Sequence, residues 1–215
     1  MTPTVKQQRQ DIRTSKRVLR NNLTPAQQHL NSQKICQRLL KTPEFIRAKK
    51  IAFYLANDGE VNLSLLLHYA QKAEKHCFLP CIEKKSAKKL YTFSEKSKKS
   101  EKKSLVFRRY TSHTKLIKNI FNIQEPCRHM PSLSGAKIDL VIVPLVSFDK
   151  KGNRLGMGGG FYDRKFNAKH HFPHTQPNLI GVAHQCQSSE HIPHLGWDVP
   201  LKCIITEKGK IHPRR

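Results

Sequence analysis

The fold is decided by the stretch Ile138-Asp-Leu-Val-Ile-Val-Pro-Leu-Val-Ser-Phe-Asp-Lys-Lys-Gly-Asn-Arg-Leu-Gly-Met-Gly-Gly-Gly-Phe-Tyr-Asp-Arg164. Its first six residues are mostly β-branched and apolar and are closed by Pro144, which predicts a buried strand. A glycine-rich turn over residues 152–160 follows, and a helix is expected from Phe161 to about Lys169. A strand that passes through a short loop into a helix is typical of α/β proteins with a parallel sheet.

Similar units lie on both sides of this stretch. The apolar run Ile51–Leu55 predicts a second buried strand, and Asn62 is suited to cap a helix that leads to a third strand at Cys77–Leu79. Further strands are expected at Leu90–Phe93, Leu105–Arg109, Leu179–Ala183 and Cys203–Thr206, with a weak strand or one helical turn at Leu116–Asn122.

The N-terminal segment is predicted to be helical. Its apolar residues recur at helical spacing: Val18, Leu19, Leu23, Leu30, Ile35, Leu39 and Leu40. The pattern indicates two helices, about 15–22 and 25–41, with Thr24-Pro25 and Gln27 forming a capping box between them. We therefore expect a single domain over residues 1–215 with a three-layer α/β/α fold, a mostly parallel central sheet and helices on both faces.

Composition restricts the class of protein. The chain has 215 residues, 37% of them hydrophobic, and its 40 Lys and Arg against 15 Asp and Glu give a formal charge of +25. This composition suits a folded domain, and neither a membrane-spanning run nor a secretory signal is present in the sequence, so the protein is expected to be cytoplasmic. A monomer is a separate expectation that no sequence pattern decides. The six cysteines are interpreted as reduced thiols, and the charge indicates an anionic partner.

The glycine-rich turn is interpreted as a phosphate cradle. Gly156, Gly158, Gly159 and Gly160 allow close backbone approach to an anion, and Arg154 and Arg164 flank them. The helix that follows adds partial positive charge at its start. The stretch matches neither a Walker A loop nor the dinucleotide-binding pattern. The alternative is an ordinary flexible turn.

Three other sets of charged residues are candidates, each with a simpler alternative. Asp163 is a candidate Mg²⁺ ligand, or else an acid in the first turn of a helix. Glu60 follows the strand at Ile51–Leu55 and is suited to bind a polar ligand, although loops often carry such residues. Lys16, Arg17 and Arg20 form a basic helix face for a polyphosphate, or a solvated one.

Taken in order, these landmarks resemble the 5-formyltetrahydrofolate cyclo-ligase family, also called 5,10-methenyltetrahydrofolate synthetases. The resemblance spans about residues 13–206. It rests on Lys16-Arg-Val-Leu-Arg20, Asp58-Gly-Glu-Val61, Asp139-Leu-Val-Ile-Val-Pro144, Phe148–Asp163, Gly181-Val-Ala183 and Trp197-Asp-Val-Pro-Leu201. It implies ATP- and Mg²⁺-dependent cyclisation of 5-formyltetrahydrofolate, with or without a polyglutamyl tail on the folate, through a phosphorylated formyl group. ADP and phosphate are released.

The resemblance also implies roles for individual residues. Arg154 and Tyr162 would be catalytic, and Asp163 would bind magnesium. ATP would contact Lys16, Arg17, Arg20, Arg154, Leu155, Gly156, Met157, Gly158, Gly159, Gly160, Phe161 and Tyr162. The folate would contact Leu55, Glu60, Met157, Gly158, Gly159, Gly160 and Phe161. A second magnesium-associated Asp of some members aligns with Lys202, and Asp198 is a nearby substitute.

Two other functions compete with this interpretation. The nine lysines between Glu83 and Ser104 are compatible with a basic nucleic-acid-binding protein on an α/β scaffold. Only Tyr91 and Phe93 lie among them, however, whereas RNA-binding modules carry patterned aromatics on strands. The third possibility is an inactive relative that keeps the scaffold. The Lys-rich insert at about 84–103 matches no motif of the family and is expected to be a solvated surface.

Overall fold

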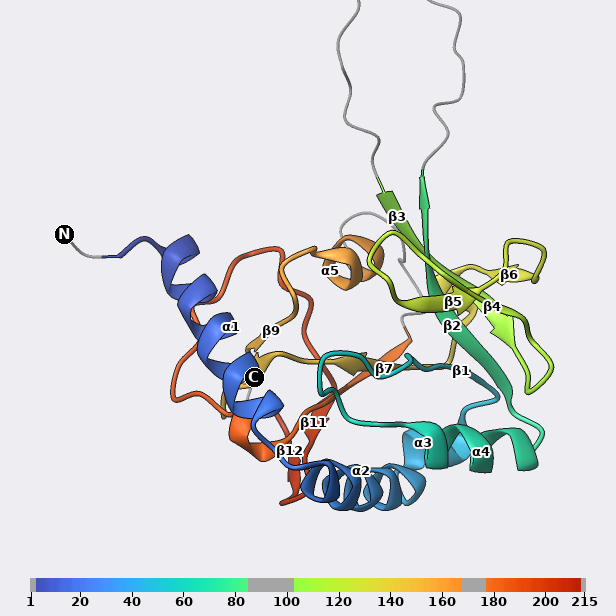
Figure 1. The fold of residues 1–215 in the computed structure, drawn as a ribbon, viewed down its shortest axis with the longest axis horizontal. Coiled ribbons are helices and arrows are strands. Elements are labelled where there is room, and N and C mark those ends of the chain that lie inside the picture. The colour runs from blue at the N-terminus through green and yellow to red at the C-terminus, as the bar shows by residue number, and fades with distance from the viewer. Residues whose placement is uncertain (1–2, 85–102, 168–176, 214–215) are drawn as a thin grey trace, which may run out of the picture.

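The computed structural model describes residues 3–84, 103–167 and 177–213, which form one eight-stranded sheet with helices against it (Figure 1). The strand order is β12-β11-β10-β7-β1-β2-β3-β6. Neighbours from β11 to β2 pair in parallel, whereas β12, β3 and β6 pair antiparallel at the two sides. The strands are β1 Lys50–Ala52, β2 His76–Lys84, β3 Lys103–Tyr110, β6 Ser132–Leu133, β7 Leu140–Pro144, β10 Asn178–Val182, β11 Cys203–Ile205 and β12 Lys210–Ile211.

Two small hairpins are attached to this sheet. One pairs β4 (Leu116–Lys118) with β5 (Gln124–Pro126), and the other pairs β8 (Ser147–Phe148) with β9 (Arg154–Leu155). The second hairpin begins three residues after β7, so it stands at the carboxyl edge of the parallel strands. This edge is where open α/β sheets bind ligands.

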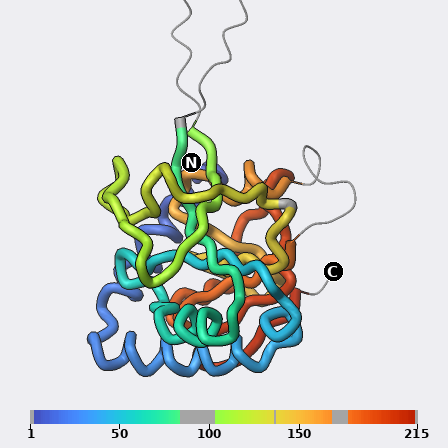
Figure 2. The backbone as a smooth tube through the Cα atoms, turned by 90° about the vertical axis from the view of Figure 1, so that its right-hand side faces the viewer, coloured from blue at the N-terminus to red at the C-terminus, as the bar shows by residue number. Residues whose placement is uncertain are grey.

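The helices form unequal layers, and Figures 1 and 2 show three of them against one face of the sheet. These are α2 (Pro25–Leu40), α3 (Pro43–Arg47) and α4 (Ser64–Lys72). They pack Ile35, Leu39 and Leu66 against strand residues of the larger core cluster. The opposite face carries the six-residue α5 (Phe161–Phe166), whose Phe166 lies in a second core cluster. The α/β fold with a mostly parallel sheet is confirmed, although its second helical layer is thin.

The capping box predicted before the second helix is confirmed. The Thr24 hydroxyl accepts a hydrogen bond from the Gln27 backbone N–H, and the Gln27 side chain accepts one from the Thr24 N–H. The two bonds satisfy N–H groups that a helix start leaves unpaired, and Pro25 needs none. The helix therefore begins at the predicted residue.

The predicted start of the first helix is wrong. Helix α1 runs from Val5 to Asn21, ten residues earlier than expected, and Val18, Leu19 and Leu30 are exposed rather than packed in the core. The expected strand at Leu90–Phe93 lies outside the described residues. No helix in the described ranges is long and apolar enough to cross a membrane.

Candidate functional site

The glycine-rich segment follows the β8–β9 hairpin, whose turn is held by hydrogen bonds to Asp149. Asp149 is fully buried at the turn of the β8–β9 hairpin, and its carboxylate accepts hydrogen bonds from the backbone N–H groups of Lys151, Asn153 and Ile192. Beyond the hairpin, Gly158 (φ +97°) and Gly160 (φ +60°) adopt left-handed backbone that other residues reach only with strain. Residues 156–160, the glycine loop, therefore leave a fixed hairpin and enter α5 through a turn that requires glycine.

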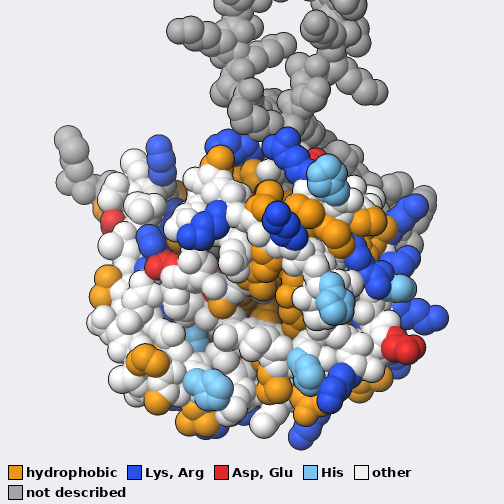
Figure 3. Space-filling view, turned by 45° about the vertical axis from the view of Figure 1, so that its right-hand side comes forward, with side chains coloured by type: hydrophobic (Ala, Val, Ile, Leu, Met, Phe, Trp, Pro, Cys, Tyr) orange, Lys and Arg blue, Asp and Glu red, His pale blue; other side chains and the backbone are white. Residues whose placement is uncertain are grey.

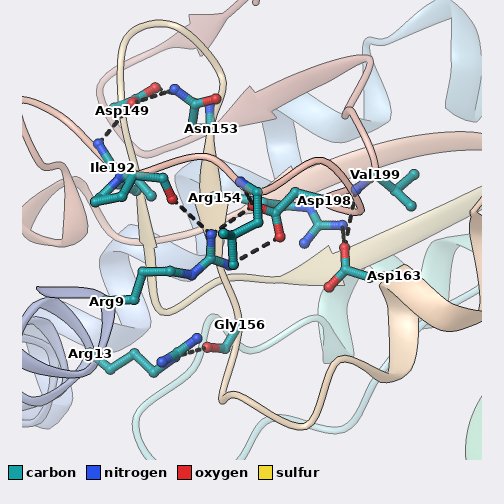
Figure 4. A network of polar contacts seen from close by, with 12 residues as sticks. Arg9, Arg13, Asp149, Asn153, Arg154, Gly156, Asp163, Ile192, Asp198 and Val199 are labelled. Atoms are coloured by element: carbon teal, nitrogen blue, oxygen red, sulfur yellow. Dashed lines mark hydrogen bonds and ion pairs between the residues drawn. The ribbon is translucent and has the colours of Figure 1, made fainter. Parts of the chain in front are cut away.

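An ion pair spans the glycine loop. The Arg154 guanidinium, 5% exposed, donates to Asp163 Oδ1 at 2.6 Å, and the Val199 N–H donates to the same oxygen at 3.2 Å (Figure 4). Arg154 Nε has no hydrogen-bond partner among the described residues. The pair fixes both ends of the loop, and neither hydrogen bond uses Asp163 Oδ2.

The side of helix α1 that is turned toward the rest of the protein carries basic side chains. Arg9, Arg13, Lys16 and Arg20 lie on successive turns at intervals of four, three and four residues, and we call them the cationic stripe. Arg9 forms two hydrogen bonds with the Asp198 carboxylate, at 2.7 and 3.0 Å. Arg13 Nε donates to the Gly156 backbone oxygen at 2.9 Å, and burial lowers the pKa of Arg13. Helix α1 is therefore held by polar contacts where a helix usually packs apolar side chains.

A cavity of about 1020 Å³ lies between the first turns of α1 and the glycine loop. Its walls are formed by Thr4, Val5, Lys6, Gln7, Arg9, Gln10, Arg13, Arg154, Gly156, Gly158, Gly160, Asp163, Leu195, Trp197 and Asp198. This volume is at the upper end of what small-molecule sites occupy. Two predicted residues, Arg154 and Asp163, therefore meet three of the predicted glycines at one cavity.

The other predicted cations do not line this cavity. Lys16 donates to the Ser188 backbone oxygen, and Arg17 and Arg20 both bind the Asp58 carboxylate, at 2.7 and 2.6 Å. Burial alone would raise the pKa of Asp58, but hydrogen bonds from Arg17 and Asn21 and the charge of Arg20 hold it at about 2. Arg20 is fully buried, and its Nε and Nη1 have no hydrogen-bond partner in the described part of the chain.

Glu60 and Tyr162 form a second group near the glycine loop. Burial raises the pKa of Glu60 to about 7, although the charge of Arg20 and a hydrogen bond from the Asn57 N–H oppose the rise. Burial and the nearby Glu60 also raise the pKa of Tyr162. Tyr162 therefore keeps its proton at neutral pH, whereas Glu60 can gain or lose one. Leu55 is partly buried against the larger core cluster, and Leu155 is fully buried in its hairpin.

On the side of the molecule that Figure 3 turns forward, the surface has a hollow with hydrophobic side chains on its floor and basic and histidine side chains around it. Two aromatic rings meet next to the glycine loop. The exposed ring of Phe121 meets Phe161 edge to face, with centroids 6.4 Å apart, and the Arg164 guanidinium lies 5.1 Å from the Phe161 centroid. Phe121 is not among the residues predicted from the sequence, where its only signal is an aromatic ring in a polar, weakly patterned segment.

The interpretation of Lys202 as the position of a second magnesium-associated carboxylate is not supported by its location. Lys202 precedes β11 at the amino edge of the sheet and lies 3.6 Å from Glu44, whereas the glycine loop follows the carboxyl edge. Asp198 lines the cavity together with Asp163. Within the described residues no group of three or more His, Cys, Asp or Glu side chains could hold a metal.

The comparisons with known proteins agree on one family. The sequence model of the 5-formyltetrahydrofolate cyclo-ligase family matches residues 5–207. The chain is 40% identical to the 5-formyltetrahydrofolate cyclo-ligase of Haemophilus influenzae over 93% of this chain and 97% of that protein. It is 36% identical to that of Escherichia coli K12 over 87% and 93%.

Solved structures show the same fold. The NMR structure of Aquifex aeolicus 5,10-methenyltetrahydrofolate synthetase matches with a TM-score of 0.74 and 29% identity, covering 96% of this chain and 93% of the other. A synthetase structure from Mycoplasma pneumoniae matches with a TM-score of 0.67 at 22% identity, covering 93% and 98%.

Proposed function

The chain belongs to the 5-formyltetrahydrofolate cyclo-ligase family, and from that premise we propose that it converts 5-formyltetrahydrofolate to 5,10-methenyltetrahydrofolate with consumption of ATP. The observation that carries this proposal is the position of the glycine loop, which lines a cavity with cations in its wall and leads directly into Phe161, whose ring meets the exposed Phe121. A loop between two sites can align a phosphate donor with its acceptor.

In the proposed reaction, the formyl oxygen attacks the γ-phosphorus of ATP, and the bond to ADP breaks. N10 of the folate then attacks the formyl carbon and loses its proton, and the C–O bond breaks to release phosphate. The phosphorylated oxygen leaves as phosphate, whereas an amide oxygen is a poor leaving group. The protein mainly has to align the reactants and stabilise negative charge.

The phosphates would lie in the cavity against the glycine loop, with Arg13 and Arg154 as the adjacent cations. Lys16, Arg17 and Arg20 are also proposed ATP contacts. To reach the phosphates, each of them would have to give up the protein oxygen that it binds in this structure. In the structure Arg20 fixes α1 to the loop at Asp58, and Lys16 fixes it to the backbone at Ser188. Arg13 is the cation that the sequence motif did not include.

The folate would lie in the hollow, with its flat pyrimidine ring near Phe161 and Phe121. Leu55 and Glu60 would border it from the loop after β1. A carboxyl group whose pKa is about 7 can accept a hydrogen bond from the ring or take up a proton at neutral pH. Tyr162, which stays protonated, can donate a hydrogen bond to a developing negative charge.

The residues present fit a magnesium ion. Mg²⁺ in nucleotide sites is usually held by one or two carboxylates together with substrate phosphates. Asp163 lines the cavity and keeps Oδ2 outside its two hydrogen bonds, and Asp198 lies in the same wall. The ion would neutralise phosphate charge.

We further infer one domain over residues 1–215. The competing nucleic-acid function rests on lysines most of which lie outside the described residues.

The test is direct. Purified protein with ATP, Mg²⁺ and 5-formyltetrahydrofolate should produce the near-ultraviolet absorbance of methenyltetrahydrofolate. The variant Arg154→Ala should lose most of this activity, since removing a donor to transition-state charge typically costs about 10²–10³ in kcat. No absorbance change at any magnesium concentration would contradict the proposal.

A further inference from the structure

A second, smaller cavity lies at the opposite edge of the sheet from the glycine loop. Its volume is about 160 Å³, and its walls are formed by Pro43, Glu44, Arg47, Ala48, Asp139, Asn178 and Lys202. These residues belong to α3 or stand at or just before the starts of β7, β10 and β11, so the cavity is at the amino edge of the parallel strands. The proposed substrates bind at the carboxyl edge, where open α/β sheets usually place ligands. The second cavity is therefore separate from the proposed active site.

The carboxylates of this cavity are incompletely hydrogen-bonded. The Glu44 side chain is 11% exposed, and its Oε2 is buried without a hydrogen-bond partner among the described residues. Lys202 and Lys210 approach the Glu44 oxygens only to 3.6 and 4.0 Å, which is too far for hydrogen bonds. Asp139 accepts two backbone N–H groups through Oδ2, and neither of these bonds uses Oδ1. A buried acceptor without a donor costs stability, so the cavity favours a ligand that donates hydrogen bonds.

The same cavity also contains cations. Arg47 is exposed and makes no hydrogen bond or ion pair with another described residue, and the Lys202 side chain is 53% exposed. The lining thus has two carboxylates and two cations. A simple anion would be repelled by the carboxylates, and a simple cation would be repelled by Arg47 and Lys202. A ligand that carries both charges can pair with both sets.

The size of the cavity restricts the ligand further. A volume of 160 Å³ is that of about five water molecules, which suits the smallest amino acids. Pro43 and Ala48 add apolar surface for a short side chain. We infer that the cavity binds a small α-amino acid, with its ammonium group against the Glu44 carboxylate and its carboxylate against the Arg47 guanidinium. This inference does not depend on the proposed cyclisation, and binding at the amino edge leaves both substrate sites free.

Ligands that lack one charge test the inference on the wild-type protein. L-Alanine should bind saturably in titration calorimetry. Propionate has no ammonium group and ethylamine has no carboxylate, so each should bind about 10- to 150-fold more weakly, the range expected for a lost hydrogen bond to a charged group. Equal affinity of L-alanine and either analogue would overturn the inference, as would the absence of saturable L-alanine binding up to about 10 mM.

Nuclear magnetic resonance locates the bound amino acid. In ¹H–¹⁵N spectra of the labelled protein, L-alanine should shift the backbone amides of residues 44–48, Asn178 and Lys202, which surround the cavity. The amides of the glycine loop, residues 156–160, should stay in place. Shifts centred on the glycine loop instead would show that the amino acid binds at the other cavity and would overturn the inference.

Variants provide the third measurement. Glu44→Gln and Arg47→Gln should each weaken L-alanine binding about 10- to 150-fold, because each removes one charge and nearly keeps the shape of the side chain. The matched control is Glu74→Gln, which neutralises an exposed carboxylate after α4 and should leave the affinity unchanged. Cyclisation without added amino acid should be the same in all three variants. Unchanged L-alanine affinity in Glu44→Gln or in Arg47→Gln would contradict the assigned contacts.

Discussion

At the residue scale, two arginines of α1 have very different surroundings although they are four residues apart. Arg13 is partly buried, lines the cavity and contacts the glycine loop, whereas the side chain of Arg17 is 45% exposed and bound to Asp58. The family motif includes only Arg17. The geometry favours Arg13 as the phosphate contact.

This difference predicts opposite results for two charge-removing variants. Arg13→Ala should raise the KM for ATP about 10-fold or more, because a hydrogen bond to a charged group contributes about 1.5–3 kcal/mol. Arg17→Ala removes an exposed ion pair worth at most about 1 kcal/mol and should change the KM little. Steady-state kinetics at saturating folate measures both. A larger effect in Arg17→Ala would restore the motif-based assignment.

Glu60 gives a prediction for the pH dependence of stability. Its pKa is about 7 in the folded protein and about 4.5 when unfolded, so the folded state binds more protons between these values. Stability due to Glu60 is therefore lost as pH rises from about 4.5 to 7. Glu60→Gln cannot ionise and avoids this loss.

Thermal melts of the two proteins should show that, from pH 5 to pH 8, the free energy of unfolding of the variant rises relative to that of the wild type by about 1–3 kcal/mol in total. The depressed pKa of Asp58 and the lowered pKa of His184 are common to both proteins and cancel in the difference. A difference that does not change with pH would mean that Glu60 is ionised throughout.

At the scale of elements, the helices show which features a sequence can reveal. Helix α2 was predicted to its first residue because its start is encoded locally by Thr24, Pro25 and Gln27. The first ten residues of α1 were missed because its inward face carries arginine and lysine, so hydrophobic periodicity is absent there. Val18 and Leu19, which formed the predicted apolar face, point to solvent.

The residues of the proposed site also differ in whether a local sequence pattern reveals them. The glycines, Arg154 and Asp163 are neighbours in sequence, and their meeting at a cavity could be predicted. Arg13 contacts Gly156 across about 140 residues of sequence and Phe121 contacts Phe161 across about 40, and no local pattern encodes such contacts. Hence the phosphate cradle was predictable, whereas the positions of Arg13 and Phe121 next to it required the fold.

The polar docking of α1 predicts which substitutions release it. Arg9→Gln leaves the buried Asp198 carboxylate without its cation, a change that typically costs about 3–5 kcal/mol. Amide hydrogen exchange across Val5–Asn21 should then become much faster. Leu19→Gln, on the exposed face, should alter stability by less than about 0.5 kcal/mol. The opposite order would mean that α1 is held by its apolar residues.

At the scale of the whole molecule, two groups of residues that contribute to the charge of +25 differ in their relation to the site. The cationic stripe is turned inward and paired with carboxylates or backbone oxygens. Residues 85–102 contain seven lysines and two glutamates in no motif of the family. Arg9 and Arg13 of the stripe line the cavity of the proposed site, whereas residues 85–102 belong to no motif, so the charge of that segment and catalysis should be separable.

One variant can test whether the charge of residues 85–102 is independent of catalysis. Lys84 and Lys103 are directly paired across β2 and β3, so replacing residues 85–102 with Asn-Gly would close the hairpin with a favoured two-residue turn and lower the charge from +25 to +20. We expect unchanged kcat and KM for cyclisation. Affinity for random single-stranded RNA should fall, and its salt slope should shrink by about 0.7 for each lysine that contacts phosphate. Loss of cyclisation in a folded variant would instead show that this segment contributes to the active site, because the parts of the sheet that carry the glycine loop and α1 are untouched by the replacement.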